Sequence, residues 1–236
     1  HAVAKTALLR QLEATLDAWT VLAVTTEGIP LYVLPHGCRR PERLLGANWA
    51  EPVHTTLFLE LITNDRTHPD LAEALCQTAR DDWGKDPYVL RGGQGIRGRL
   101  LSALLREAFF LVENGYVSVE GVDRCCRNDA GYYLPFAGNF RYMDLMGTYI
   151  YGLVMRELNP ELTKNPRLPL FFEEILRRGG EGMANGRGFY QYSPGERETW
   201  EAQAARFSHQ IADLIRKYPF SYADAPRREQ PSLVHE

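Results

Sequence analysis

The chain has 236 residues, and 44% of them are hydrophobic, which is enough apolar sequence to build one large domain or two small ones. Its formal net charge is -3 and its basic residues form no long run, so no overall attraction to phosphate backbones or anionic lipid is expected. We therefore expect neither a nucleic acid nor a membrane as a partner of this protein.

The cysteines and the apolar runs bear on where such a chain would work. Cys38, Cys76, Cys125 and Cys126 are scattered, and they match neither a disulfide framework nor a CxxC metal site. No run of about 18 or more apolar residues occurs, and the N-terminus lacks the charged and then apolar pattern of a secretory signal. We expect a globular protein of the reducing cytoplasm, without a bound metal.

The first 90 residues alternate between helix and strand patterns. Leucines at helical spacing and apolar positions on one helical face mark the helices, which are predicted over 2–18 and 68–83. Short β-rich runs predict the strands, which span 20–24, 44–49, 57–62 and 88–90. Pro52 separates two of these strands, because proline cannot donate a ladder hydrogen bond. This order of elements predicts an α/β domain.

Strand patterns almost vanish after Arg99. A helix is predicted from Leu100 to Leu111, where Asn114-Gly115 ends it, and Ser118 is expected to cap a second helix. Later helices are predicted over 140–158, 168–178 and 197–216. The stretch 223–236 is rich in proline and charge and is expected to be a poorly packed tail.

Residues 93–98 match the GxGxxG motif of dinucleotide-binding loops. They follow a predicted strand, precede a helix, and have Glu120 at a distance suited to a ribose contact. Glycines there would let backbone N–H groups approach a pyrophosphate. A Rossmann domain, however, needs further strand and helix units after Glu120, and helices follow instead. A flexible linker between two domains accounts for the glycines better.

Three segments carry a resemblance to a known family. Residues 180–192 form a glycine-rich run that ends in GFYQY, residues 138–147 read GNFRYMDLMG, and residues 48–62 match the spacing of HFFNPVxxxxLVEVI. They resemble segments of the 3-hydroxyacyl-CoA dehydrogenases, and the likeness continues over most of the chain. It places residues 93–98 in the linker between two domains.

The resemblance implies an incomplete Rossmann-like α/β domain followed by an all-α dimerisation domain. The implied limits are 1–92 for the later part of the NAD-binding domain, 93–195 for the helical domain, and 196–236 for a last helix and tail. NAD as cofactor and a homodimer through the helical domain are further implications. Residues 1–92 are expected to lack the opening strand of the NAD-binding domain, its glycine loop and the ribose-binding acid. The NAD site is therefore expected to be incomplete.

The family's catalytic histidine falls at Asn48, and the carboxylate that orients it falls at Glu60. In the family the imidazole removes the proton of the 3-hydroxyl group while hydride passes to the nicotinamide, so the base must titrate near neutrality. An amide can orient a hydroxyl or carbonyl group but cannot accept a proton. His54 could substitute as the base, although a histidine after Pro52-Val53 also fits a loop. Glu60 could instead pair with a local donor.

Other family positions concern cofactor and substrate. Lys5, Thr25 and Thr26 match positions beside the cofactor, whereas Glu27 and Gly98 replace a serine and an asparagine that contact the substrate oxygen.

We therefore expect an NAD-dependent oxidoreductase of fatty acid metabolism that interconverts a 3-hydroxyacyl and a 3-oxoacyl thioester, or a related hydroxy acid, at a divergent site. The alternative is a noncatalytic remnant of the fold that dimerises or binds acyl-CoA.

Overall fold

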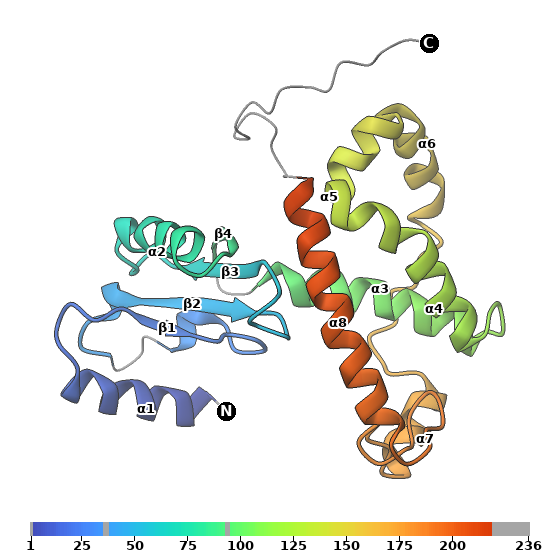
Figure 1. Cartoon of the computed structure of the whole chain (residues 1–236), viewed down its shortest axis with the longest axis horizontal. Helices are drawn as coiled ribbons and strands as arrows, with labels where there is room; N and C mark the ends of the chain where they lie inside the picture. The colour runs from blue at the N-terminus through green and yellow to red at the C-terminus, as the bar shows by residue number, and fades with distance from the viewer. Residues whose placement is uncertain (1, 35–37, 93–94, 219–236) are drawn as a thin grey trace. The chain divides into compact units, whose positions relative to one another are not determined.

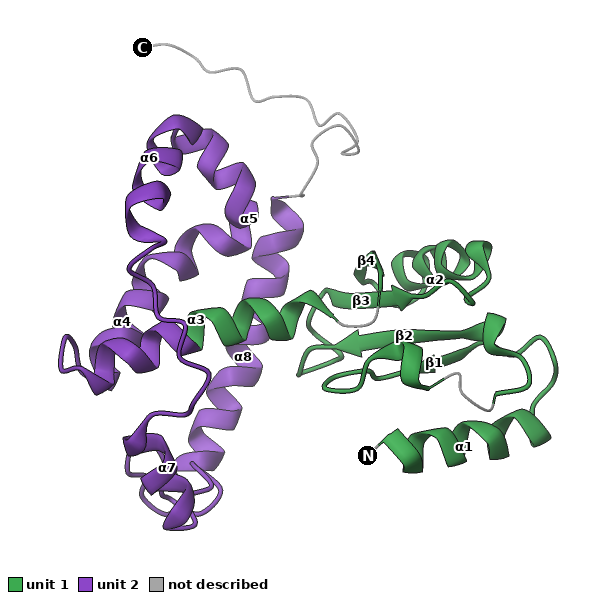
Figure 2. Cartoon of the chain, turned by 180° about the vertical axis from the view of Figure 1, so that it is seen from behind, with its two compact units in different colours: residues 1–105 green, residues 106–236 purple. Residues whose placement is uncertain are grey.

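The computed structural model describes residues 2–34, 38–92 and 95–218 of the chain. It divides into two compact units, residues 1–105 and 106–236 (Figure 2). The first unit is α/β, with Rossmann-like architecture, and the second is helical. The fold class expected from the sequence is therefore confirmed, while the three domain limits stay a prediction.

The first unit is built on one four-stranded sheet of mixed direction. Its strands are β1 (Leu22–Val24), β2 (Leu44–Trp49), β3 (Phe58–Thr63) and β4 (Asp86–Arg91), in that spatial order. β1 pairs parallel with β2, β2 pairs antiparallel with β3, and β3 pairs parallel with β4. Helices α1 (Ala2–Thr15) and α2 (Pro69–Asp81) lie on opposite sides of the sheet (Figure 1). All six predicted elements are present.

Side chains that alternate along β2 and β3 form a core on each face of the sheet. The buried residues on the α2 side are Leu45, Ala47, Leu59, Leu61, Cys76 and Ala79. The buried residues on the α1 side are Leu9, Leu22, Leu31, Leu34, Leu44 and Ile62. Residues 48 and 60 share the parity of Leu44 and Ile62, so they belong to the α1 face of the sheet.

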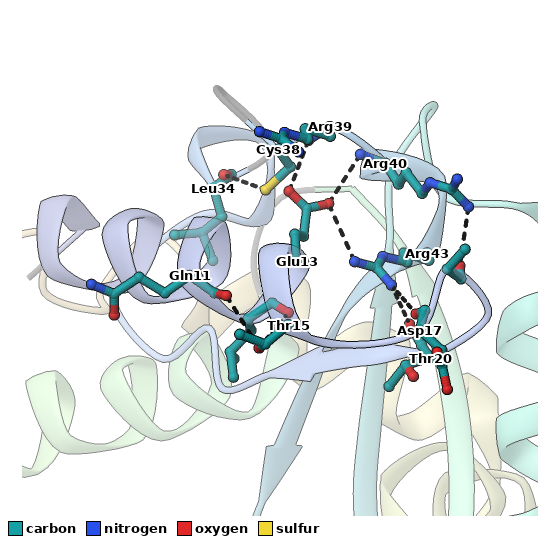
Figure 3. Close-up of polar contacts among 12 residues, drawn as sticks. Gln11, Glu13, Thr15, Asp17, Thr20, Leu34, Cys38, Arg39, Arg40 and Arg43 are labelled. Carbon is teal, nitrogen blue, oxygen red and sulfur yellow. Dashed lines mark hydrogen bonds and ion pairs between the residues drawn. The ribbon is translucent and has the colours of Figure 1, made fainter.

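A buried ionic contact ties α1 to the segment before β2 (Figure 3). The Glu13 carboxylate accepts hydrogen bonds from the backbone N–H groups of Arg39 at 2.8 Å and Arg40 at 3.0 Å. Its Oε1 lies 3.8 Å from Nη2 of Arg43, and the two side chains are only 2% and 7% exposed. Arg43 Nη1 also donates to the carbonyl oxygen of Asp17 at 2.6 Å. This cluster, called the Glu13 anchor below, fixes α1 against the sheet.

The helical part begins with α3, which crosses the boundary between the units. Its helices are α3 (Ile96–Glu113), α4 (Val119–Asn128), α5 (Ala130–Met146), α6 (Thr148–Leu158), α7 (Leu170–Arg177) and α8 (Glu196–Lys217). Ser118 caps α4 as expected, since its Oγ accepts from the N–H of Gly121 at 3.0 Å. None of the helices in the described ranges is both long and apolar enough to cross a membrane.

The single helix predicted over 140–158 is wrong. Two helices occupy the region, and α5 already begins at Ala130. Gly147 separates them because its backbone has a φ of 115°, which no helix accommodates and which glycine adopts without steric cost. A second glycine, Gly138 with a φ of 65°, kinks α5. The predicted tail at 223–236 lies outside the described residues.

Candidate active site

Asn48 and Glu60 meet across the antiparallel strands β2 and β3. Their Cα atoms are paired in register, and Asn48 Nδ2 donates to Glu60 Oε1 at 3.0 Å. Both side chains are buried, with exposed fractions of 3% and 0%. Directly opposed residues of an antiparallel pair have neighbouring side chains on one face. The register therefore explains why an interval of twelve residues brings these two together.

The Glu60 carboxylate is surrounded by further neutral donors. Its Oε2 accepts from the Tyr88 hydroxyl at 2.9 Å, from the backbone N–H of Ile96 at 2.9 Å and from that of Arg97 at 3.4 Å. Burial, and then the hydrogen bond to Glu60, raises the pKa of the Tyr88 phenol above its ordinary value. Tyr88 is therefore a hydrogen-bond donor to Glu60 and not a proton acceptor near neutral pH.

Asn48 uses both ends of its amide within the protein. Its Oδ1 accepts from the backbone N–H of Thr26 at 2.8 Å and from the Thr26 hydroxyl at 3.2 Å. Because a backbone N–H can only donate, these contacts fix which end of the amide is oxygen, and Nδ2 is left to face Glu60. Asn48 thus links Thr26, the second residue after β1, to Glu60 on β3. The side chain holds no basic atom.

Gly95 lies against the buried pair. A Cβ at this position would sit 1.8 Å from Glu60 Oε1 and 2.9 Å from Asn48 Nδ2, so a side chain there would force these buried groups to shift. The glycine is therefore required for the chain to pass close enough for Ile96 to donate to Glu60. This packing accounts for one glycine of the GxGxxG match, whereas Gly93 and Gln94 lie outside the described residues.

Glu27 and Arg97 form an ion pair beside the buried groups. Arg97 Nη1 lies 2.8 Å from Glu27 Oε1, and the side chains are 42% and 53% exposed respectively. A Cβ on Gly98 would meet no atom within 4 Å, so the position beside Arg97 is open. Of the two expected substrate positions, Glu27 thus belongs to this exposed charge pair, and Gly98 follows Arg97 in the chain.

Four other expected site residues, Lys5, Thr25, Thr26 and His54, differ in how they relate to this network. Lys5 Nζ, on α1, donates to the carbonyl oxygen of Thr25, whose exposed side chain follows the carboxyl end of β1. Thr26 is buried and is bound to Asn48. His54 is exposed and lies in the turn between β2 and β3, outside either strand.

Tyr88, Gly95 and Arg97 lie against Glu60, and the family resemblance assigns none of them to the catalytic site. Tyr88 is the register partner of Glu60 across β3 and β4. Two predicted adjacent strands with apolar flanks could have indicated that pairing. The approach of Gly95 and Arg97 depends on how α3 begins, which no periodicity in the sequence reveals. Within the described residues no group of three or more histidine, cysteine or acidic side chains could hold a metal ion.

Comparison with known proteins follows the same division of the chain. Residues 1–92 match the family model of the 3-hydroxyacyl-CoA dehydrogenase NAD binding domain, and residues 96–192 match that of the 3-hydroxyacyl-CoA dehydrogenase C-terminal domain. The two matches leave out only residues 93–95 of the first 192.

Two curated relatives illustrate the range of the family. The chain is 29% identical over 203 residues to 5-formyl-3-hydroxy-2-methylpyridine 4-carboxylate 5-dehydrogenase of Mesorhizobium japonicum, covering 86% of this chain and 66% of that protein. It is 26% identical over 198 residues to the fatty acid oxidation complex subunit alpha of a Shewanella species, covering 84% of this chain and 27% of that protein. The chain therefore spans less than two thirds of the length of either relative.

Solved structures agree with the sequence matches. A crystal structure of the same pyridine carboxylate dehydrogenase, described as an NAD+ dependent dismutase, superposes with a TM-score of 0.87 at 27% identity, over 93% of this chain and 71% of that one. FadB2 of M. tuberculosis gives a TM-score of 0.64 at 26% identity, over 82% and 68% of the two chains. By both its domains and its fold, this chain belongs to the 3-hydroxyacyl-CoA dehydrogenase family.

Proposed function

We propose that the protein containing this chain is an NAD-dependent oxidoreductase that acts on a hydroxyl or oxo group at the site formed by Asn48 and Glu60. The observation that carries the proposal is the cross-strand pair itself, in which a buried carboxylate and a buried amide take the places of the family's carboxylate and base. The match of residues 1–92 to an NAD binding domain supports the cofactor.

Two residues near the carboxyl end of β1 support the binding of part of a nicotinamide cofactor. Thr25 is exposed directly after the carboxyl end of the parallel strand β1, where open α/β sheets bind ligands, and Lys5 brings a cation to its carbonyl group. Thr26 serves differently, since Asn48 occupies both its N–H and its hydroxyl. We propose that Lys5 and Thr25 hold the cofactor and that Thr26 positions Asn48. Bound NAD would supply the hydride acceptor or donor.

We propose that the site is divergent because position 48 no longer supplies a base. The amide of Asn48 cannot take a proton, and its oxygen already accepts two hydrogen bonds from Thr26. Its contribution is to hold the carboxylate of Glu60 and the end of β1 in fixed positions. Loss of a general base lowers the rate by about 10²- to 10⁴-fold, so slow turnover on a family substrate remains compatible with this site.

The substrate we propose is a 3-hydroxyacyl or 3-oxoacyl thioester, or a related hydroxy acid. Two relatives support the two choices, since one is named for fatty acid oxidation and the other for a pyridine carboxylate. Glu27 and Gly98, at the family's substrate-contact positions, place a charge and an open space where neutral hydrogen-bonding groups are expected.

Steady-state oxidation of NADH with acetoacetyl-CoA tests the divergent site. The protein containing this chain is compared with its Asn48→His variant and with Arg124→Gln, a matched surface change. We expect turnover well below that of a family enzyme with histidine at this position, and no change in Arg124→Gln. Turnover at the family's usual level in the unaltered protein would refute the divergence.

The rival proposal is a noncatalytic protein that retains the fold. Asn48 favours it because the oxygen and the nitrogen of its amide both form hydrogen bonds within the protein. Titration with NADH separates the two functions. Fluorescence follows the binding, and the stoichiometry is determined on protein of verified mass. Saturable binding supports the oxidoreductase, whereas no binding supports the remnant.

We also propose that the protein forms a homodimer through its helical unit. Apolar side chains are exposed along α5 and α6, including Leu145 at 65%, Tyr149 at 76% and Ile150 at 58%. Large exposed apolar patches mark interaction sites, and these side chains are candidates for one. Light scattering after size exclusion is expected to give twice the chain mass for the wild type and a monomer for Ile150→Asp.

The domain limits and the compartment are proposals of the same kind. We propose a boundary between residues 92 and 93, since the family matches end at 92 and resume at 96. Four free thiols, one of them exposed at Cys125, favour a reducing cytoplasm.

A further inference from the structure

Five residues close a ring of polar contacts after the carboxyl end of β1. Thr26 donates to Asn48, which donates to Glu60. The backbone N–H of Arg97 also donates to Glu60, while the guanidinium of Arg97 pairs with Glu27, the chain neighbour of Thr26. All five lie in the first compact unit. The Glu27–Arg97 contact is the exposed part of this ring, and the other three side chains are buried.

The backbone and the side chain of Arg97 contact different carboxylates. Only its backbone N–H serves Glu60, and its guanidinium faces Glu27. Arg97 is thereby fixed at the network by its main chain, while its side chain remains half-exposed to solvent. A guanidinium carries a fork of donors that matches the geometry of a carboxylate.

The Glu27 carboxylate shows that an anion of this shape fits against Arg97, at 2.8 Å from Nη1. An exposed ion pair contributes little free energy, so a carboxylate from solution can replace Glu27 at small cost. The surface at Gly98, next to Arg97, offers room because an added Cβ would meet nothing within 4 Å.

The helical surface pairs provide a contrast. Arg124–Glu120 and Arg197–Glu201 each join residues four positions apart on one helix. The Glu27–Arg97 pair joins residues 70 positions apart and adjoins a buried carboxylate. Its placement therefore depends on the tertiary fold, as that of a ligand contact does.

We propose that Arg97 is a substrate-binding residue that takes a free carboxylate group of the substrate, with Glu27 as the counterion that the substrate displaces. This rests on the proposed function and narrows its substrate to a hydroxy or oxo acid with an ionised carboxylate close to the reacting carbon. No covalent step is involved, since one carboxylate exchanges for another at the same guanidinium.

Calorimetric titration without NAD tests the proposal apart from any redox activity. The probes are 3-hydroxybutyrate and its neutral primary amide, and the proteins are the wild type, Arg97→Gln, Glu27→Gln and the matched surface variant Arg124→Gln. Circular dichroism and thermal melting confirm that each variant is folded.

We expect the wild type and Arg124→Gln to bind the acid more tightly than the amide. Arg97→Gln should raise the Kd of the acid by on the order of tenfold or more and leave that of the amide unchanged. Glu27→Gln should lower the Kd of the acid, because the competing carboxylate is gone.

Three results would overturn the inference: no binding of the acid, equal Kd values for acid and amide in the wild type, or an unchanged Kd in Arg97→Gln. Weaker binding of the acid to Glu27→Gln would contradict the proposal that the substrate displaces Glu27 from Arg97. Acid binding that depends on Arg97 in a protein that neither binds nor oxidises NADH would refute the proposed function and leave Arg97 as a carboxylate-binding residue only.

Discussion

Two glutamates of the first unit have almost fully buried side chains, and they are held in different ways. Glu13 accepts from two backbone N–H groups and faces the guanidinium of Arg43, so a positive charge balances its own. Glu60 accepts from an amide, a phenol and two backbone N–H groups, all of them neutral. Loss of a charged partner leaves a buried charge uncompensated, and it costs more than the loss of one neutral hydrogen-bond donor. The contrast separates an anchor from a candidate site within one sheet.

Removal of the cation from the Glu13 anchor is expected to have the largest effect. Arg43→Met leaves the Glu13 carboxylate buried without a counterion, which costs about 3 to 5 kcal/mol of unfolding free energy. Urea denaturation at neutral pH measures the loss. The control is Arg216→Met, which breaks the exposed pair with Asp213 and should cost under about 0.5 kcal/mol. Equal losses in the two variants would mean that the anchor is no stronger than a surface pair.

A methyl group at Gly95 tests how tightly Glu60 is enclosed. Gly95→Ala places a Cβ 1.8 Å from Glu60 Oε1, and the forced shift should cost about 1 to 3 kcal/mol. Gly98→Ala, three residues later on α3, is the matched control. Its Cβ meets nothing within 4 Å, and alanine favours helix over glycine, so we expect no loss and up to about 1 kcal/mol of gain. Chemical denaturation of both variants measures these changes in unfolding free energy. A harmless Gly95→Ala would show that Glu60 has room to move.

The hydrogen bond from Tyr88 to Glu60 gives a smaller effect that depends on pH. Tyr88→Phe should cost about 1 kcal/mol near neutrality, because one neutral donor to the carboxylate is lost. The pKa of Tyr88 is raised in the folded state, so the folded protein holds the phenol proton more tightly than the unfolded chain does. This contribution is fully present below the unfolded pKa of about 10 and is lost as pH rises toward the folded value.

Unfolding free energies of the wild type and Tyr88→Phe, measured from neutral to alkaline pH, check this sign. The advantage of the wild type should be constant up to about pH 10 and shrink above it. Tyr132→Phe, at an exposed phenol, should stay within about 0.5 kcal/mol of the wild type at neutral pH. An advantage that grows with pH would contradict the assigned direction.

Arg97→Gln should have the smallest effect on stability. The backbone N–H that serves Glu60 is retained, and only the exposed pair with Glu27 is lost, which contributes at most about 1 kcal/mol. A loss of unfolding free energy as large as that in Arg43→Met would show that the Arg97 side chain, like that of Arg43, is needed for folding. A small loss sharpens the contrast, because it shows that the guanidinium is not needed for folding.

The strands and helices of the first unit could be predicted because their apolar spacing reflects local periodicity. The interval between residues 48 and 60 likewise indicated the pair, although only the register shows that Asn48 Oδ1 is taken by Thr26. The break at Gly147 escapes prediction because the residues on both sides of it do form helices. The break depends on the φ of 115° at this one glycine, and apolar periodicity carries no information about a backbone dihedral angle.

The partners of Glu60 that come from outside its hairpin were harder to predict. Tyr88 depends on which strand adds to β3, and Arg97 depends on the path of the chain into α3. Both are consequences of tertiary arrangement, so residue types and spacing in one sequence do not determine them. The same holds for the Glu13 anchor, in which α1 meets backbone groups of residues 39 and 40.

The antiparallel register of β2 and β3 has a consequence for how related chains should be aligned. Residues 48 and 60 stay opposite each other because the ladder fixes them, while the intervening turn only has to return the chain. Residues could be added to or deleted from that turn without separating the amide from the carboxylate, provided that the ladder keeps its register. In distant homologues, a count other than twelve between these two positions would therefore not disqualify a match.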